Sequence, residues 1–256
     1  GGGICYVYPQ SLRLQYLVFF PVADGVLLPD GTILFVNGCQ QGIAGFDRGR
    51  EPILEPIIYD PRKVRGQRWT TKLAGSDIPR MYHSVALLIP DGRVWIAGSN
   101  PNQPANASAI PFPTEFRVEY FSPPYLFNPD NTPAAKPLVS SVSATLRYGH
   151  PFTFNVNLQA AANEINFQPP LAIAGSATQK NVQVVLINPG FVTHSLHMSQ
   201  RLVELEYKLS ENEDTLTVTP PPNPNIFPPG PAWLYVVSRG VPAVGVKVML
   251  ALMESN

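Results

Sequence analysis

The sequence predicts an all-β fold, a partial kelch-type β-propeller followed by an immunoglobulin-like β-sandwich. Three observations support this prediction. Short apolar runs are joined by Pro-Asp-Gly turns in the first half of the chain, this hairpin pattern recurs after about 61 positions, and no stretch has convincing helical periodicity. We assign residues 24–127 to the blades of an incomplete propeller and residues 136–256 to the sandwich, and we assign no role to residues 1–23.

The first hairpin begins directly after Asp24. Residues 25–28 and 32–36 are apolar runs on either side of a Pro-Asp-Gly turn. Two short strand-like pieces, residues 56–61 and 67–70, follow it and are bounded by turn residues. Together these segments predict a unit of four strands.

The second hairpin repeats this pattern, with residues 85–89 and 94–97 flanking a Pro-Asp-Gly-Arg turn. Four strands per unit, with a tyrosine and a tryptophan after the hairpin, are typical of a kelch-type propeller blade. A β-sandwich meander also repeats hairpins. The propeller is favoured because the order hairpin, Tyr-Asp-Pro, tryptophan runs through one unit before the hairpin recurs.

The sequence pattern changes after the second hairpin. Residues 99–114 are a polar and proline-rich loop, residues 115–126 supply a further strand, and residues 128–137 have the composition of a linker. Seven short apolar runs follow, which is the pattern of an immunoglobulin-like sandwich. These runs are residues 138–142, 151–156, 182–187, 201–208, 215–218, 232–237 and 244–252.

The composition excludes several classes of protein. The chain has 256 residues, of which 45% are hydrophobic and 14% charged, with 18 basic and 18 acidic side chains. A large core is therefore available, and the basic footprint of a nucleic-acid-binding protein is missing. The apolar run at residues 17–22 is too short to cross a bilayer, so we expect no membrane partner.

Two features bear on the cellular compartment. Cys5 and Cys39 permit at most one disulfide, which leaves the redox compartment open. Asn106-Ala107-Ser108 fits the N-glycosylation pattern and favours secretion, whereas no signal peptide opens the chain.

Candidate chemistry begins at Tyr82-His83, directly before the strand of the second hairpin. Neighbouring side chains of a regular strand point to opposite faces, so two neighbours converge on one ion only where the chain leaves regular pairing. A loop entering a strand is such a place. The simpler alternative is a packed aromatic ring beside a hydrogen-bonded histidine.

His194 is the other candidate, and we expect it on a loop between two apolar strands of the sandwich. Two imidazoles and a phenolate form a nitrogen and oxygen donor set suited to copper(II). The sequence has no Cys-x-x-Cys pair, no Gly-x-Ser-x-Gly elbow and no His-Glu-x-x-His motif that would compete with this set. Asp24, Asp30 and Asp91 are interpreted as ordinary turn residues.

Several segments resemble one known family in order and spacing. They are residues 80–84, the following Leu-Leu-Ile-Pro-Asp-Gly-Arg-Val, residues 98–101, residues 121–126, and Val192-Thr193-His194-Ser195 with Gln200-Arg201. Together they closely resemble the C-terminal half of glyoxal oxidase, which belongs with galactose oxidase among the copper radical oxidases. The resemblance runs from about residue 24 to residue 252.

The resemblance implies a seven-bladed kelch propeller followed by an immunoglobulin-like domain that contributes one copper ligand. Tyr82 matches the axial tyrosine ligand, the catalytic residue that accepts the substrate's proton. His83 matches an equatorial copper ligand, and His194 matches the second histidine. The implied activity is oxidation of small aldehydes to carboxylic acids, with oxygen reduced to hydrogen peroxide, by a secreted, monomeric enzyme.

The family's radical cofactor, a tyrosine cross-linked to a cysteine, is not assigned to Cys5 or Cys39. This chain has room for about two full blades, so a truncated or mispredicted gene product is expected to lack turnover on its own. Two further hypotheses stay open. One is a kelch and sandwich module that binds a protein or glycan; the other is a degenerate relative that binds copper without catalysis.

Overall fold

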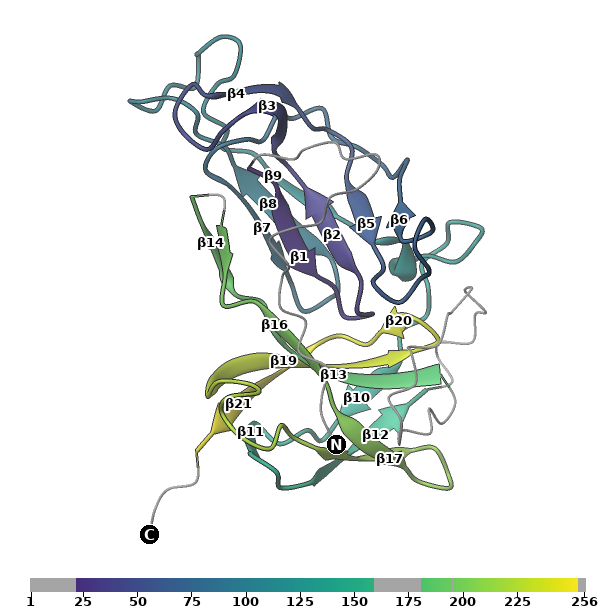
Figure 1. Ribbon diagram of the computed structural model, residues 1–256. Helices are drawn as coiled ribbons and strands as arrows, with labels where there is room; N and C mark the ends of the chain where they lie inside the picture. Colours follow the sequence, from purple (N-terminus) through teal and green to yellow (C-terminus); the bar gives the residue numbers. More distant parts are fainter. Residues whose placement is uncertain (1–21, 159–180, 195, 253–256) are drawn as a thin grey trace.

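The computed structural model describes residues 22–158, 181–194 and 196–252 (Figure 1). Within these ranges the chain is built of β-strands and one short 3₁₀-helix, η1 (Pro124–Leu126), which confirms the predicted all-β class. No helix in these ranges has the length and apolarity needed to cross a membrane. The unassigned start, residues 1–21 and Cys5 included, lies outside the described residues.

The first hairpin lies at one edge of an antiparallel sheet with the order β1-β2-β5-β6. The predicted turn forms between β1 and β2, because Asp30 Oδ1 accepts the Thr32 backbone N–H at 3.0 Å and Gly31 takes φ +83°. The strands are β1 (Asp24–Leu27), β2 (Ile33–Val36), β5 (Ile57–Tyr59) and β6 (Trp69–Thr70).

The second hairpin forms a separate sheet, β7 (Ser84–Leu88), β8 (Val94–Gly98) and β9 (Val118–Phe121), with three described strands. Its first strand, β7, contacts β1 of the other sheet. A further pair, β3 (Cys39–Gly42) and β4 (Gly49–Pro52), was not predicted. Both strands are short and largely polar, so they lack the apolar pattern on which the prediction rests.

The second half of the chain forms two packed sheets. Their facing side chains, among them Phe154 and Leu216 from one sheet and Leu186 and Leu234 from the other, form one apolar core. One sheet is β10 (Leu138–Ser140), β12 (Phe152–Asn157), β18 (Thr215–Thr219) and β17 (Glu206–Leu209). The other is β11 (Thr145–Arg147), β21 (Val246–Ala251), β19 (Gly230–Ser238), β13 (Val182–Asn188) and β16 (Arg201–Glu204), with β20 (Val241–Pro242) paired to β19.

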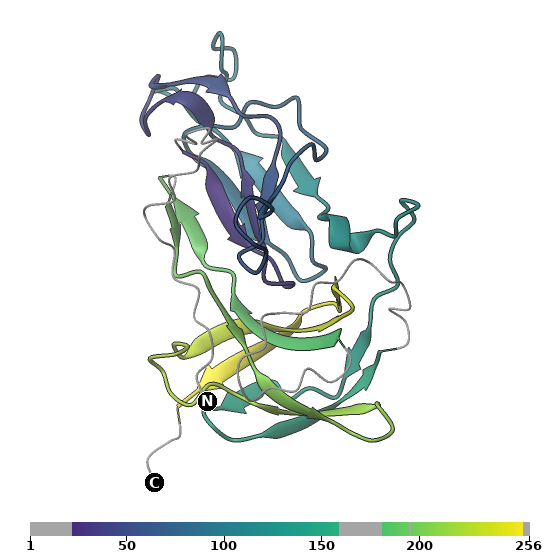
Figure 2. The ribbon, with the colours of Figure 1, turned by 45° about the vertical axis from the view of Figure 1, so that its right-hand side comes forward.

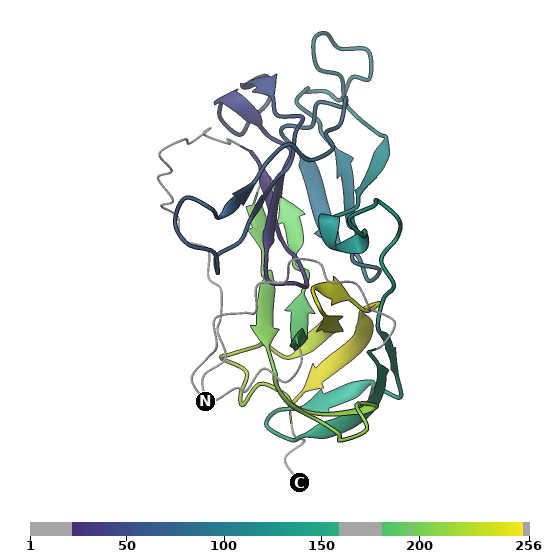
Figure 3. The same cartoon turned by 90° about the vertical axis from the view of Figure 1, so that its right-hand side faces the viewer.

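The two halves of the chain share a second core. Successive residues of β13 alternate between cores: Val184 and Leu186 pack inside the sandwich, whereas Val185 and Ile187 pack against the two N-terminal sheets. The central strands are therefore buried on both faces, which explains why β13 is a continuous apolar run rather than an alternating one. Figures 2 and 3 show the sandwich packed against the lower end of the N-terminal sheets.

The later part of the chain forms hydrogen bonds to the Pro-Asp-Gly-Arg turn of the second hairpin. Four consecutive carbonyl oxygens, those of Ile89 and of the first three turn residues, each accept a hydrogen bond from η1 or from a residue that follows it. The donors are Tyr235 Oη to Ile89, Gly245 N to Pro90, Lys136 Nζ to Asp91 and Tyr125 Oη to Gly92. We call this arrangement the turn socket; it ties the sandwich to the second sheet.

A narrow ribbon of two strands, β14 (Phe191–Thr193) and β15 (Leu196–Met198), rises from the sandwich alongside β1 and β7 (Figures 1 and 3). His194 lies at the tip of this ribbon. His194 thus lies on a turn between strands, as expected, but the two strands that carry it were not predicted. Apolar side chains of the ribbon, Phe191, Leu196 and Met198, lie on its exposed face, whereas the other face is only partly buried. The ribbon therefore lacks the apolar alternation that makes a strand recognisable in sequence.

Candidate metal centre

Tyr82 and His83 occupy a tight turn directly before β7. The Ser84 N–H donates to Met81 O at 3.0 Å, and the Asn100 N–H donates to Tyr82 O at 2.7 Å. His83 has φ +62°, in the left-handed region, which histidine enters more often than most residues. This conformation turns the His83 ring onto the same side as Tyr82, and the two rings stack with centroids 3.9 Å apart. The expected departure from regular pairing is therefore present.

The tip of the ribbon brings His194 to the same place. Its ring centroid lies 5.0 Å from that of His83 and 6.2 Å from that of Tyr82. His194 also has a left-handed backbone, with φ +49°. Two such residues cost of the order of 1–3 kcal/mol each and recur at functional sites. The structure thus brings together all three residues singled out from the sequence, which come from opposite halves of the chain.

The donor set and spacing fit a metal ion. With metal–nitrogen bonds of about 2 Å, the ring centres of two imidazoles at adjacent positions of one ion lie about 4.5–5 Å apart, close to the 5.0 Å between His83 and His194. His194 Nδ1 lies 2.7 Å from Thr193 Oγ1. When Nδ1–H donates to that hydroxyl, Nε2 keeps its lone pair for an ion.

Among the described residues, no group of three or more His, Cys, Asp or Glu side chains is arranged to hold a metal. The candidate donor set is therefore the two imidazoles and the Tyr82 phenol. Two imidazoles and a phenol suit copper(II), which prefers tetragonal sites with nitrogen and oxygen ligands. His197 is no part of the set, since its Nε2 lies 2.7 Å from Pro189 O within the ribbon.

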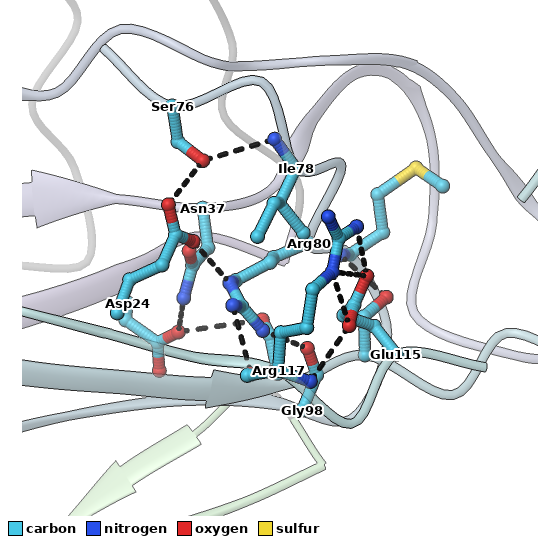
Figure 4. Close-up of polar contacts among 12 residues, drawn as sticks. Asp24, Asn37, Ser76, Ile78, Arg80, Gly98, Glu115 and Arg117 are labelled. Carbon is cyan, nitrogen blue, oxygen red and sulfur yellow. Dashed lines mark hydrogen bonds and ion pairs between the residues drawn. The ribbon is translucent and has the colours of Figure 1, made fainter. Parts of the chain in front are cut away.

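A buried arginine fixes the segment that carries Tyr82 and His83. Arg80 is 2% exposed, and its Nε bonds Glu119 Oε2 at 2.9 Å (Figure 4). Its other nitrogens donate to Gly98 O at 2.7 Å and Arg117 O at 2.9 Å. Because every arm of the guanidinium is engaged with β8, β9 or the residues just before β9, the start of β7 has little freedom to move.

Asp24 was interpreted from the sequence as a turn residue, and this was wrong. It is the first residue of β1 and is 2% exposed. Its Oδ2 accepts hydrogen bonds from Asn37 Nδ2 at 2.7 Å and Ser84 Oγ at 3.5 Å (Figure 4). Burial raises the pKa of Asp24 to about 7, against the weaker opposing effect of these hydrogen bonds. Asp24 therefore joins the two N-terminal sheets beside the metal centre.

One aromatic neighbour of the site had no signal in the sequence. Phe46, from the segment between β3 and β4, packs edge-on against Tyr82 and His83 with centroids 5.4 and 5.5 Å away. Edge-to-face contacts at this distance are favourable. They shield one side of the stacked pair from water.

Two family models match this chain. The model described as "Glyoxal oxidase N-terminus" covers residues 20–125, and the one described as "Galactose oxidase-like, Early set domain" covers residues 136–250. The two halves of the chain thus resemble separate domains of one group of enzymes, glyoxal oxidase for residues 20–125 and galactose oxidase-like proteins for residues 136–250.

Individual proteins agree with these matches. The chain is 34% identical to aldehyde oxidase GLOX1 of Arabidopsis thaliana and 36% identical to aldehyde oxidase GLOX of Vitis pseudoreticulata, over 90% of its own length in both cases. It spans 35% and 41% of those two proteins. A galactose oxidase of Gibberella zeae is 27% identical over 87% of this chain and 28% of its own.

A solved structure shares the fold of this chain. It is a fungal alcohol oxidase of the AA5 family in complex with copper, with a TM-score of 0.68 and 25% identity. The match covers 90% of this chain and 42% of the alcohol oxidase.

Proposed function

We propose that this chain binds copper through Tyr82, His83 and His194, and that the whole protein is a glyoxal oxidase-like copper radical oxidase. The proposed reaction converts a small aldehyde, as its hydrate, and oxygen to a carboxylic acid and hydrogen peroxide. The observation that carries this proposal is the meeting of two imidazoles and a phenol from separate halves of the chain.

Copper, when bound, supplies a Lewis acid for the substrate oxygen and a one-electron redox centre. His83 and His194 are assigned as its nitrogen ligands and Tyr82 as an oxygen ligand. Tyr82 Oη is also assigned as the catalytic base that accepts the proton of the substrate hydroxyl. Arg80 and Phe46 restrain Tyr82 and His83, so these donors are held in place before any ion arrives.

The family's cysteine-linked tyrosine radical is not assigned to this chain. Cys5 lies outside the described residues, and Cys39 is buried at the start of β3. We therefore assign copper binding to these 256 residues and aldehyde oxidation to the whole protein.

The proposed architecture follows the family. Residues 24–127 are assigned to kelch-type propeller blades, with β1 and β7 as neighbouring inner strands, and residues 136–256 to an immunoglobulin-like sandwich. The contact between β1 and β7 and the ribbon that runs beside both support this proposal. We also propose a secreted monomer, for which the exposed Asn106-Ala107-Ser108 triplet is supporting evidence.

Copper titration of the purified chain tests the metal centre. The wild-type chain is expected to bind one copper(II), and Tyr82→Phe and His194→Ala are each expected to weaken binding at least about tenfold, the scale on which site residues change metal affinity. His150→Ala is the matched control, because His150 is an exposed histidine of the same half of the chain. Unchanged affinity in both test variants would refute the site and favour the non-enzymatic binding module.

A second measurement concerns turnover. With methylglyoxal as substrate, the 256-residue chain loaded with copper is expected to release no hydrogen peroxide. Peroxide release above that of the His194→Ala variant would contradict the assignment of the radical cofactor to another part of the protein.

A further inference from the structure

The Gln200 side chain joins the base of the ribbon to β1. Gln200 lies directly before β16, after a bend at Ser199 that ends β15. Its Oε1 accepts the Leu27 backbone N–H at 2.6 Å, and its Nε2 donates to Gly25 O at 2.9 Å. One amide therefore takes both a donor and an acceptor from the same strand.

This pairing imitates a neighbouring strand. β1 lies at the end of its sheet, with β2 on one side. Residues 25 and 27 of a strand expose their N–H and C=O groups on one edge, two positions apart. The Gln200 amide has one acceptor and one donor group at its tip and so closes this edge as a peptide group would. An edge that would otherwise be open is satisfied at the point where the ribbon arrives.

The contacts along the ribbon link the position of its base to the position of His194 at its tip. β15 contacts β1, and β14 contacts β7, so the ribbon lies along the first strands of both sheets. Its base is closely packed, because a Cβ on Gly190 would lie 2.3 Å from Met198 O. His197 adds a bond from its Nε2 to Pro189 O at 2.7 Å. A shift of the base along β1 therefore moves His194 along the sheets.

We propose that Gln200 is a positioning residue of the metal centre: its amide sets the register of the ribbon on β1, and this register places His194 against His83 and Tyr82. This inference rests on the proposed function. Gln200 touches none of the three ring side chains in its hydrogen bonds, so it acts through the ribbon and not as a ligand.

The turn socket supplies the control. Tyr235 Oη donates to Ile89 O at 3.0 Å across the same interface between the halves of the chain. It lies at the opposite end of β7 from His83. Tyr235→Phe loosens the attachment of the sandwich without touching the ribbon, so it separates a loss of docking in general from a loss of register.

The test compares copper(II) affinity and the electron paramagnetic resonance spectrum of the copper-loaded chain in four forms: wild type, Gln200→Ala, Gln200→Asn and Tyr235→Phe. Asn keeps the amide but is one methylene shorter, so it cannot reach both Gly25 and Leu27. We expect about tenfold or greater loss of affinity and an altered spectrum in both Gln200 variants. Tyr235→Phe is expected to lower the unfolding midpoint while its affinity stays within about twofold of wild type and its spectrum stays unchanged.

Wild-type affinity and spectrum in a folded Gln200 variant would overturn the inference. Equal losses in Tyr235→Phe and Gln200→Ala would also overturn it, since general docking would then explain both. Should Gln200→Ala fail to fold, Gln200→Asn decides by the same criteria. Loss of copper binding in His194→Ala with no effect of Gln200→Asn would refute the positioning role alone, whereas no effect of His194→Ala would refute the proposed function itself.

Discussion

Replacing Asp24 by Asn is expected to remove a specific pH dependence of stability. Asp24 is buried between the two N-terminal sheets, and its Oδ1 has no hydrogen-bond partner in the described part of the chain. Desolvation dominates its environment and raises its pKa from 3.8 to about 7. The folded protein therefore favours the neutral carboxyl group.

The sign and size of the effect follow from linkage. Between pH 3.8 and about 7 the folded state binds a proton at Asp24 that the unfolded state has released. Stability contributed by this group is thus fully present below pH 3.8 and is lost as the pH rises through about 7. A shift of about three pKa units corresponds to about 4 kcal/mol in the free energy of unfolding.

Urea denaturation from pH 4.5 to pH 8.5, without added metal, measures this loss. Wild type and Asp24→Asn share every other titrating group, so the difference between their unfolding free energies isolates Asp24. We expect this difference to change by about 3 kcal/mol in favour of the variant between the two pH values, because part of the full effect is already lost at pH 4.5. Asp130→Asn, at an exposed turn, is the control and should show no comparable change. A difference between wild type and Asp24→Asn that is independent of pH would refute the reasoning.

Three further outcomes are expected. Arg80→Met should lower the free energy of unfolding by about 3–5 kcal/mol in urea, because it leaves Glu119 and two carbonyl groups without their buried partner; a loss no larger than that of Arg117→Met, which breaks an exposed pair, would contradict this. Gly190→Ala should weaken copper(II) binding, because φ +70° and the close Met198 O oppose a side chain there, and wild-type affinity by titration would count against a rigid ribbon. When the chain is expressed in a eukaryotic secretory host, Asn106 should carry an N-linked glycan, because its side chain is exposed and its Oδ1 accepts the Ser108 N–H at 2.9 Å. Absence of a mass shift between wild type and Asn106→Gln would refute this expectation.

The hairpins could be predicted because their turns are specified locally. Asp30 and Asp91 each accept the backbone N–H two residues later at 3.0 Å, as Pro-Asp-Gly turns require. Asp24 has the same Asp-Gly neighbourhood but is buried by a strand 60 positions later. Its role depends on tertiary packing, which a local pattern does not contain.

The site was only partly visible in the sequence. Tyr82, His83 and His194 could be named from the resemblance and from donor chemistry, but their meeting depends on two left-handed backbones and on a ribbon without buried residues in its strands. Phe46 carries no recognisable motif, and Gln200 appeared only within a resembling segment with no role assigned, because both act by packing or pairing with distant backbone and rings. The double burial of β13 was likewise visible only as an apolar run.

The most direct test of the central claim is pulsed electron paramagnetic resonance of the copper(II)-loaded chain, which counts the imidazole rings coupled to the metal. The account predicts two coupled imidazoles in wild type, one in His83→Ala and one in His194→Ala. Identical imidazole counts in wild type and His194→Ala would contradict it, because the two halves of the chain would then not share the ion.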